Sequence, residues 1–283
     1  MTRLLLTLAT LAMAASTNAK DVLYPDPGLS VLNDAFIAAI GPGAARTVSP
    51  FTEGQLPRNC AEQASTRCGT AAMEAFSVSF SDCDMSWAVC RCPDAPVSLD
   101  QLLDSFGRLP PNLRAHVRTV IALPDTSNSA YSNANDIVLL GDVPAFSVML
   151  HEAAHTLDKG RSGEQEFLSV LDQDSCWADD YAKGNGEGDG ATKPEVWAQN
   201  LVLRRYEVSV GPLDRDASCM ANQLRVAAQQ TDAQLASATC DGFKETPDEV
   251  VPRRRRRAAR GEHVVRSTPA GSTQGYPNPI NFD

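Results

Sequence analysis

The segment His151-Glu152-Ala153-Ala154-His155 lies near the middle of this 283-residue chain and holds two of its four histidines. On an α-helix, His151 and His155 stand one turn apart on the same face, so both imidazoles can bind one metal ion. Glu152 lies beside them, where a carboxylate can take a proton from a water that the metal activates. This H-E-x-x-H spacing is typical of zinc peptidases and predicts a Zn²⁺ site with Glu152 as the catalytic base.

The flanking residues predict the helix that this motif needs. Residues 137–140 (IVLL) are a short apolar run stopped by Gly141, which indicates a buried strand. We expect Asp142 to cap the next helix, Pro144 to lie in its first turn and Gly160 to end it. The histidines then occupy a stripe separate from the apolar one. Strand 137–140 is expected to pair with an extended substrate peptide.

A catalytic zinc site usually has three protein ligands and one position open to water, so a third ligand is needed. Glu195 follows Pro194 at the start of a second expected helix, residues 194–203. A glutamate on a helix packed across the first would complete a His2Glu site, and Glu195 is therefore the preferred ligand. Gln199, one turn further along, is expected to hydrogen-bond the site.

Other carboxylates compete for the same role. Asp158 shares the histidine face but lies only three residues after His155, so a hydrogen bond to a ligand imidazole is the preferred role for it. Glu164 and Glu166 lie in a polar segment beyond Gly160 and stay open as ligands. For an oxyanion donor the chain offers Tyr181 or Tyr206, either of which can instead be a packed tyrosine.

Several short motifs together resemble one family. They are residues 151–158 (HEAAHTLD), 195–198 (EVWA), 81–83 (SDC), 90–92 (CRC) and Trp87. The chain resembles HExxHxxD peptidases with a glutamate ligand on a later helix, and among these the secreted fungal proteins of the conidiation-specific-protein-13 type. The resemblance covers residues 60–205.

This resemblance implies a zincin-like fold and a bound zinc ion. It gives corresponding roles to His151, Glu152, His155 and Glu195. Gln199 stands where the related lethal-factor-like peptidases carry a second glutamate.

The two ends of the chain differ from its body. Arg3, an apolar run and then small residues predict a signal peptide over residues 1–19, with an uncleaved anchor as the alternative. Residues 247–283 are rich in Pro, Gly, Ser, Thr and Arg, and predict a disordered basic tail. Its run of arginines, residues 253–257, is either a solvated charge block or a site where a processing protease removes residues 258–283.

Cysteine usage agrees with export. An even number of cysteines in an exported chain predicts four disulfides. The alternative is that the cysteines at 83, 90 and 92 bind a metal ion as a metal knot. The eight cysteines are Cys60, Cys68, Cys83, Cys90, Cys92, Cys176, Cys219 and Cys240.

Charge narrows the class of partner. The chain carries −10 overall, while residues 251–283 hold seven arginines against Glu262 and Asp283, a net +5. Residues 1–250 therefore carry −15, which argues against nucleic acid or an anionic membrane as partner. An extended peptide or protein is the expected substrate, and a monomer the expected state.

The whole pattern predicts an α+β fold. A disulfide-rich β-region is expected over residues 20–97, including a strand at 76–80, and a zincin-like catalytic region over residues 98–246, which begins with a helix capped by Ser98. The predicted function is a secreted zinc-dependent endopeptidase. The alternative is an exported, disulfide-stapled binding or surface protein that has a zinc site but no turnover.

Overall fold

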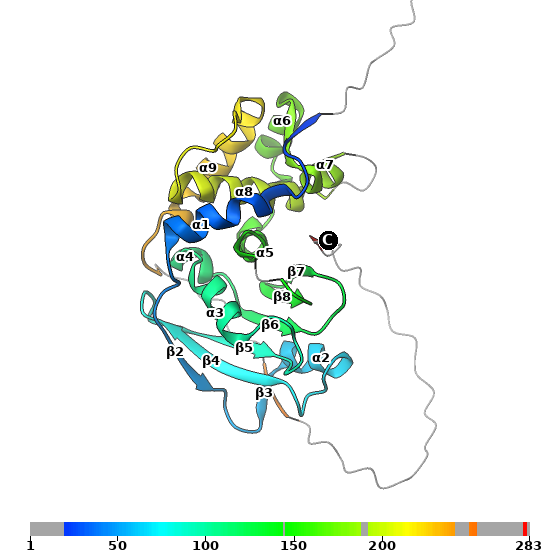
Figure 1. Ribbon diagram of the computed structural model, residues 1–283, viewed down its shortest axis with the longest axis vertical. Coiled ribbons are helices and arrows are strands. Elements are labelled where there is room, and N and C mark those ends of the chain that lie inside the picture. The colour runs from blue at the N-terminus through cyan, green and yellow to red at the C-terminus, as the bar shows by residue number, and fades with distance from the viewer. Residues whose placement is uncertain (1–19, 144, 188–191, 241–248, 254–279, 282–283) are drawn as a thin grey trace, which may run out of the picture.

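The computed structural model of the protein describes residues 20–143, 145–187, 192–240, 249–253 and 280–281. Within them, the largest sheet is mixed and has the strand order β11-β7-β8-β6-β5-β4-β2 (Figure 1). Its strands are β2 (Arg46–Pro50), β4 (Glu74–Phe80), β5 (Ser86–Arg91), β6 (Thr119–Leu123), β7 (Ser129–Asn133), β8 (Asp136–Leu140) and β11 (Ile280–Asn281).

The centre of the sheet is parallel and apolar. β5, β6 and β8 run parallel to one another, and every residue of β6 and β8 is buried. Continuous apolar strands are typical of parallel strands that are covered on both faces. β8 lies between β6 and β7, so both of its edges are already paired. The prediction that residues 137–140 pair with a substrate is therefore wrong, because an apolar run does not reveal how many neighbours a strand has.

Helices cover both faces of the sheet. α3 (Leu99–Gly107), α4 (Pro111–Arg114) and α5 (Phe146–Asp158) lie on one side, and α2 (Arg58–Thr66) lies on the other (Figure 1). Side chains along β5 alternate between the two faces of the sheet and so contact the helices on both sides. Trp87 packs edge-on against Phe106 of α3, while Cys90 forms a disulfide with Cys60 of α2.

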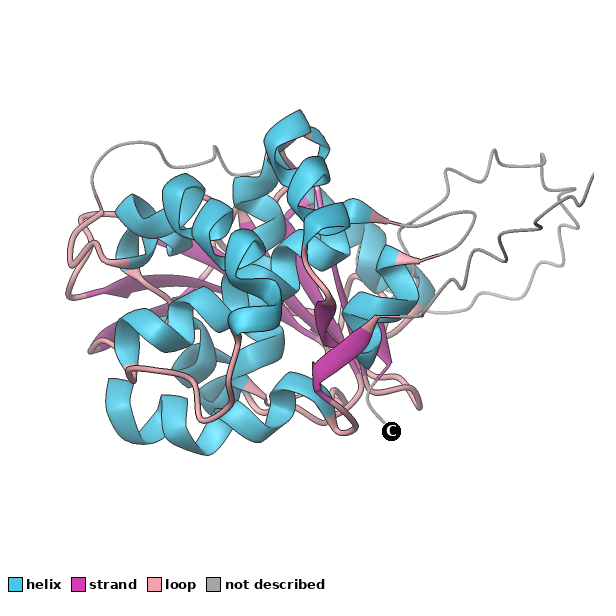
Figure 2. Ribbon diagram, turned by 90° about the horizontal axis from the view of Figure 1, so that it is seen from above, coloured by secondary structure: helices cyan, strands magenta, loops and turns pink. Residues whose placement is uncertain are grey.

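A second group of helices packs around α5. α8 (Lys193–Ser209) contacts α5 directly and is itself contacted by α1 (Asn33–Ile40), α7 (Asp180–Gly186) and α9 (Ala221–Leu235). α6 (Gln165–Gln173) packs on α9. Seen from above, these helices lie over the strands (Figure 2). Among the described helices, none is both long and apolar enough to cross a membrane.

The N-terminal residues join this helical group. β1 (Asp21–Tyr24) pairs in parallel with β9 (Cys176–Asp179), and a 3-10 turn, η1 (Gly28–Leu32), follows it. Two further 3-10 turns, η2 (Arg161–Gly163) and η3 (Ser218–Met220), connect helices. The regions expected at 20–97 and 98–246 share one sheet, since β5 pairs with β6 across that boundary.

All eight cysteines are paired, which confirms four disulfides and excludes the metal knot. One disulfide fastens α2 to β5, and a second joins the segments that follow these two elements. A third joins the β4–β5 turn to the segment after α9, and the fourth joins β9 to η3. The pairs are Cys60–Cys90, Cys68–Cys92, Cys83–Cys240 and Cys176–Cys219.

Two short strands lie in the C-terminal region. Within the expected disordered tail, β10 (Val250–Pro252) pairs antiparallel with β3 (Gln55–Pro57), and β11 pairs with β7. The average composition of the tail does not reveal its two adjacent valines, which are β-branched and pair with the open edge of β3. The expected signal peptide, most of the tail, and the cleavage site after residue 257 lie outside the described residues.

Candidate metal centre

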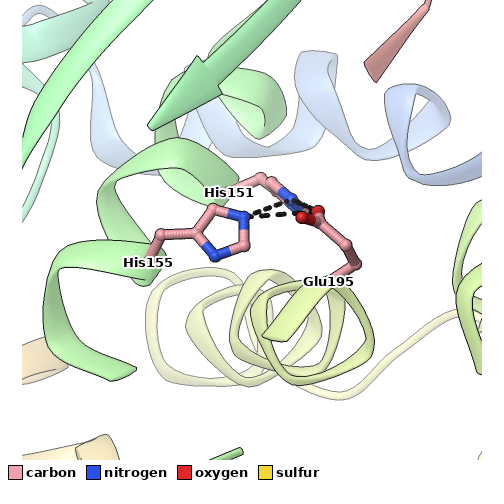
Figure 3. A group of neighbouring side chains, drawn as sticks. All are labelled: His151, His155 and Glu195. Atoms are coloured by element: carbon pink, nitrogen blue, oxygen red, sulfur yellow. Dashed lines mark hydrogen bonds and ion pairs between the residues drawn. The ribbon is translucent and has the colours of Figure 1, made fainter. Parts of the chain in front are cut away.

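The motif residues meet where two helices pack together. His151 and His155 project from α5, Glu195 projects from the first turn of α8, and the three side chains point toward one another (Figure 3). His151 and Glu195 are buried, and His155 is partly exposed. The structure therefore brings together the three side chains that the sequence nominates as ligands.

Distances among the three donor atoms suit one small cation. His151 Nε2 lies 3.0 Å from Glu195 Oε2 and 3.1 Å from His155 Nε2. His155 Nε2 lies 3.3 Å from the same carboxylate oxygen. Donors bound about 2.1 Å from a zinc ion at tetrahedral angles stand ~3.4 Å apart, so these separations fit zinc.

Hydrogen bonding presents the His151 lone pair to this cluster. Its Nδ1 lies 3.2 Å from Gln199 Oε1, an oxygen that can only accept, so Nδ1 carries the proton and Nε2 the lone pair. Burial lowers the pKa of His151, which keeps the ring neutral. Two imidazoles and a carboxylate then face each other, an arrangement that a cation stabilises.

For His155 and Glu195, burial and the neighbouring groups shift the pKa in opposite directions. Burial by itself would lower the pKa of His155, but its hydrogen bond to Glu195 and the charge of Glu152 raise that pKa above its ordinary value. Burial opposes ionisation of Glu195 too, yet its interactions with the two adjacent imidazoles hold its pKa below the usual range. Glu195 is therefore ionised and supplies the negative charge that a divalent cation needs.

Glu152 is the unsatisfied member of the site. Its side chain is 1% exposed, and neither carboxylate oxygen has a hydrogen-bond partner among the described residues. Burial raises its pKa to about 8. An unpartnered buried carboxylate is costly, and such a group is retained where it has a task. This orphaned carboxylate fits a centre that holds a metal ion and a water molecule.

Tyr181 closes the centre from α7. Its hydroxyl donates to Glu195 Oε2 at 2.9 Å, and its ring packs edge-on against His151 with centroids 5.8 Å apart. Burial raises the pKa of the Tyr181 phenol, so it remains a proton donor. Of the two tyrosines named as oxyanion donors, this one lies in the site.

Two expected roles are not seen. Asp158 accepts hydrogen bonds from the backbone N–H and the hydroxyl of Ser162, both at 2.7 Å, because its carboxylate closes the turn after α5. It acts on His155 by charge rather than by a hydrogen bond. Tyr206 packs edge-on against Phe36 in the core, three turns along α8 from Glu195, so it is no oxyanion donor.

The alternative glutamate ligands lie elsewhere. Glu164 accepts a hydrogen bond from Gln230 on α9, and Glu166 pairs with Arg225 at 3.5 Å on the same helix. Both side chains are turned toward α9 because α6 begins at this point and packs there. Neither belongs to the cluster of metal-ligating atoms among the described residues.

The start of α5 also differs from expectation. Its N-cap residue is Ala145, which has no capping side chain, and the backbone N–H of Ser147 donates to Asn33 Oδ1 at 2.8 Å. Asp142 lies too far before the first turn, and its own N–H donates to Asn128. Pro144 is outside the described residues. Asn33 lies 114 residues before Ser147, so no local pattern in the sequence indicates that it caps this helix.

Asp179 was missed by the sequence analysis. It ends β9, is 2% exposed, and accepts a hydrogen bond from Gln199 Nε2 at 2.8 Å. It also caps α7 by accepting from the N–H of Ala182, and burial raises its pKa to about 6. An aspartate between a strand and a helix is a helix-start signal that would have located the residue but not its partner.

A cavity of about 150 Å³ adjoins the centre. It lies between α5, α7 and the N-terminal segment, and its lining includes His151, Tyr181 and the apolar residues Leu29 and Val148. The exposed Asp180 also lines it. The cavity is therefore adjacent to His151, one of the candidate metal ligands.

Comparisons with known proteins place the chain in a family. The family model described as conidiation-specific protein Con-13 matches residues 26–252, a range that includes His151, His155 and Glu195. Conidiation-specific protein 13 of Neurospora crassa is 28% identical over 192 residues, which are 63% of this chain and 54% of that protein. The chain thus spans about half the length of this relative, and no solved structure matches it. Because the family match extends over most of the sequence, the chain belongs to the Con-13 family.

Proposed function

We propose that this protein is a zinc-dependent endopeptidase with a zincin-like catalytic region. One observation carries the proposal: three ligand atoms from His151, His155 and Glu195 converge beside the buried, unpartnered carboxylate of Glu152. Two imidazoles and a carboxylate are the ligand set of catalytic zinc, and a carboxylate next to them suits a general base.

Each residue has a task in peptide hydrolysis. Zinc, when bound, lowers the pKa of water toward neutrality and polarises the peptide carbonyl. Glu152 accepts the proton of the attacking water and delivers it to the amine as the C–N bond breaks. The hydroxyl of Tyr181 is a donor within reach of the carbonyl oxygen, where negative charge develops.

The substrate would lie along β7 rather than β8. β7 is the strand next to β8 in the sheet, and it contacts α5, which carries the two histidines. An extended peptide added to this strand would gain backbone hydrogen bonds. Part of that edge is occupied by the chain itself, since Ile280 and Asn281 pair with Ala130 and Ser129. The cavity beside His151 is suited to receive one substrate side chain.

We propose further that the enzyme acts outside the cell. Four disulfides are consistent with an oxidising compartment, and the N-terminal residues have the pattern of an export signal. An acidic body over residues 1–250 is consistent with a peptide or protein substrate rather than nucleic acid.

The first test is Glu152→Gln in the full chain. The amide keeps the size of the side chain but cannot accept the proton, so zinc should stay bound while hydrolysis of a peptide library falls by about 10²–10⁴-fold. Zinc content by mass spectrometry and cleavage products by chromatography are the measurements. Glu164→Gln, on the side of α6 that faces Gln230, is the matched control and should cleave normally.

The outcome separates three possibilities. Undiminished turnover in Glu152→Gln rejects the mechanism. If the wild-type protein holds zinc but shows no chelator-sensitive cleavage of peptides, the result favours an exported binding protein with a structural zinc site. A wild-type protein that retains no zinc rejects the metal centre.

A further inference from the structure

We infer that Asp179 is a positioning residue that fixes the amide of Gln199, so that the Gln199 carbonyl oxygen faces His151 Nδ1 and His151 offers its Nε2 lone pair to a metal ion. The inference rests on the proposed metal centre. It extends that centre by one residue, on a strand that contributes none of the metal ligands.

Three side chains form a continuous buried series. Asp179 Oδ2 accepts from Gln199 Nε2 at 2.8 Å, and Gln199 Oε1 lies 3.2 Å from His151 Nδ1. Asp179 and His151 are each 2% exposed, and Gln199 is 7% exposed. Water therefore has little access to these polar groups, and each must be satisfied by its neighbour.

Gln199 by itself does not determine the protonation of His151. An amide has an oxygen that accepts and a nitrogen that donates, and the two ends have nearly the same shape. With the nitrogen toward His151, Nδ1 would have to accept and the proton would move to Nε2, where it blocks metal binding. The orientation of one buried amide thus decides whether this imidazole can be a ligand.

An ionised carboxylate removes the ambiguity because it only accepts. Asp179 must meet the nitrogen end of the Gln199 amide, which leaves the oxygen end for His151. Partners that orient a ligand histidine commonly affect metal affinity by about 10–100-fold.

The surrounding backbone fixes Asp179 in turn. Its Oδ1 accepts from the N–H of Ala182 at 2.8 Å at the start of α7. Gly28, with φ +66°, approaches so closely that an added Cβ would lie 3.0 Å from Asp179 Oδ2. β1 and the turn that follows it therefore cover this carboxylate and hold it against Gln199.

The test exchanges the two functional groups. In Asp179→Asn the amide can donate to Gln199 Oε1, so the Gln199 amide can turn its nitrogen toward His151, and zinc affinity should fall by about 10–100-fold. In Gln199→Glu two carboxylates meet, and affinity should fall as well. In the double variant the carboxylate at 199 accepts from both neighbours, and affinity should return to within about threefold of wild type.

Affinity is measured on the full chain by competition with a chromophoric chelator, and ligand geometry by the visible absorption of the Co²⁺-substituted protein. Asp180→Asn is the matched control, because this neighbouring carboxylate is exposed and bonds only the Asp26 N–H among the described contacts. Thermal unfolding checks the fold, and Asp179→Ser, which keeps a cap for α7, replaces Asp179→Asn should the latter unfold.

Recovery in the double variant supports the inference, since a residue that serves only as a helix cap gives no such recovery. Unchanged affinity in Asp179→Asn, or a double variant as weak as the single one, overturns it. Failure of the wild-type chain to bind either Zn²⁺ or Co²⁺ would instead overturn the metal centre on which the inference rests.

Discussion

At the scale of single residues, burial acts in opposite directions on the titratable groups. It raises the pKa of Glu152 to about 8 and of Asp179 to about 6, because burial deprives each ionised carboxylate of the hydration that stabilises it in water. It lowers the pKa of His116 to about 4, and the nearby Lys159 and Arg161 add to this effect. The same physical cause therefore favours the neutral form of all three side chains.

His116 predicts how stability depends on pH. Its pKa is lowered in the folded state, so the unfolded chain alone takes up a proton as pH falls from 6.5 toward 4, and the free energy of unfolding decreases in that window. Because the side chain is only half-buried, we expect a loss of about 1–2 kcal/mol. Urea unfolding at pH 7 and pH 4.5 measures it. His116→Gln should lose less stability than wild type over the same interval, and equal losses would show that His116 is not responsible.

At the scale of elements, α5 depends on a distant residue for its first turn. Asn33 accepts from the N–H of Ser147, and its own amide nitrogen donates to the carbonyl of Ser30 at 2.9 Å. The cap thus links η1 and α1 to the helix that carries the motif. Unfilled N–H groups at a helix start are costly when no side chain reaches them.

Asn33→Ala should destabilise the protein by about 1 kcal/mol, the usual effect of removing a helix cap. Asn33→Asp keeps an acceptor beside the positive end of α5 and should recover most of this loss. Chemical denaturation of both variants gives the comparison. A full loss in Asn33→Asp would assign the effect to the bond with Ser30 instead of the cap.

Expectations from sequence succeed for these elements where the signal is local. The helix around His151, the strands at 76–80 and 137–140 and the helix capped by Ser98 follow from patterns within a few residues. Contacts between segments that are distant in the sequence have no such local signal. The cap by Asn33, the interior position of β8 and the bond between Asp179 and Gln199 all join segments that periodicity treats separately.

At the scale of the whole molecule, the C-terminal residues return to the sheet. β11 pairs with β7 at Ser129 and Ala130, the edge proposed for the substrate. β10 pairs with β3 on the way, and Arg58 forms an ion pair with Glu249 beside it. A substrate bound as proposed would therefore compete with the end of the chain for the same backbone groups.

Removing residues 254–283 should free this edge. We expect KM for an extended peptide to fall about fivefold, equivalent to about 1 kcal/mol of released backbone pairing. Steady-state kinetics of the full and shortened chains measure the change. A synthetic peptide with the sequence of residues 278–283 should inhibit the shortened chain. Identical KM values, with no inhibition by that peptide, would show that β11 does not compete.

The cap from Asn33 and the approach of Gly28 to Asp179 also give the order of synthesis a role. A ribosome makes Gly28 and Asn33 long before Asp179 and Glu195. The contacts of these early residues can therefore form only after the later segments have been synthesised. A nascent chain that ends before Glu195 has the two histidines but lacks the proposed third ligand. The set of candidate ligands is therefore complete only after α8 has been synthesised.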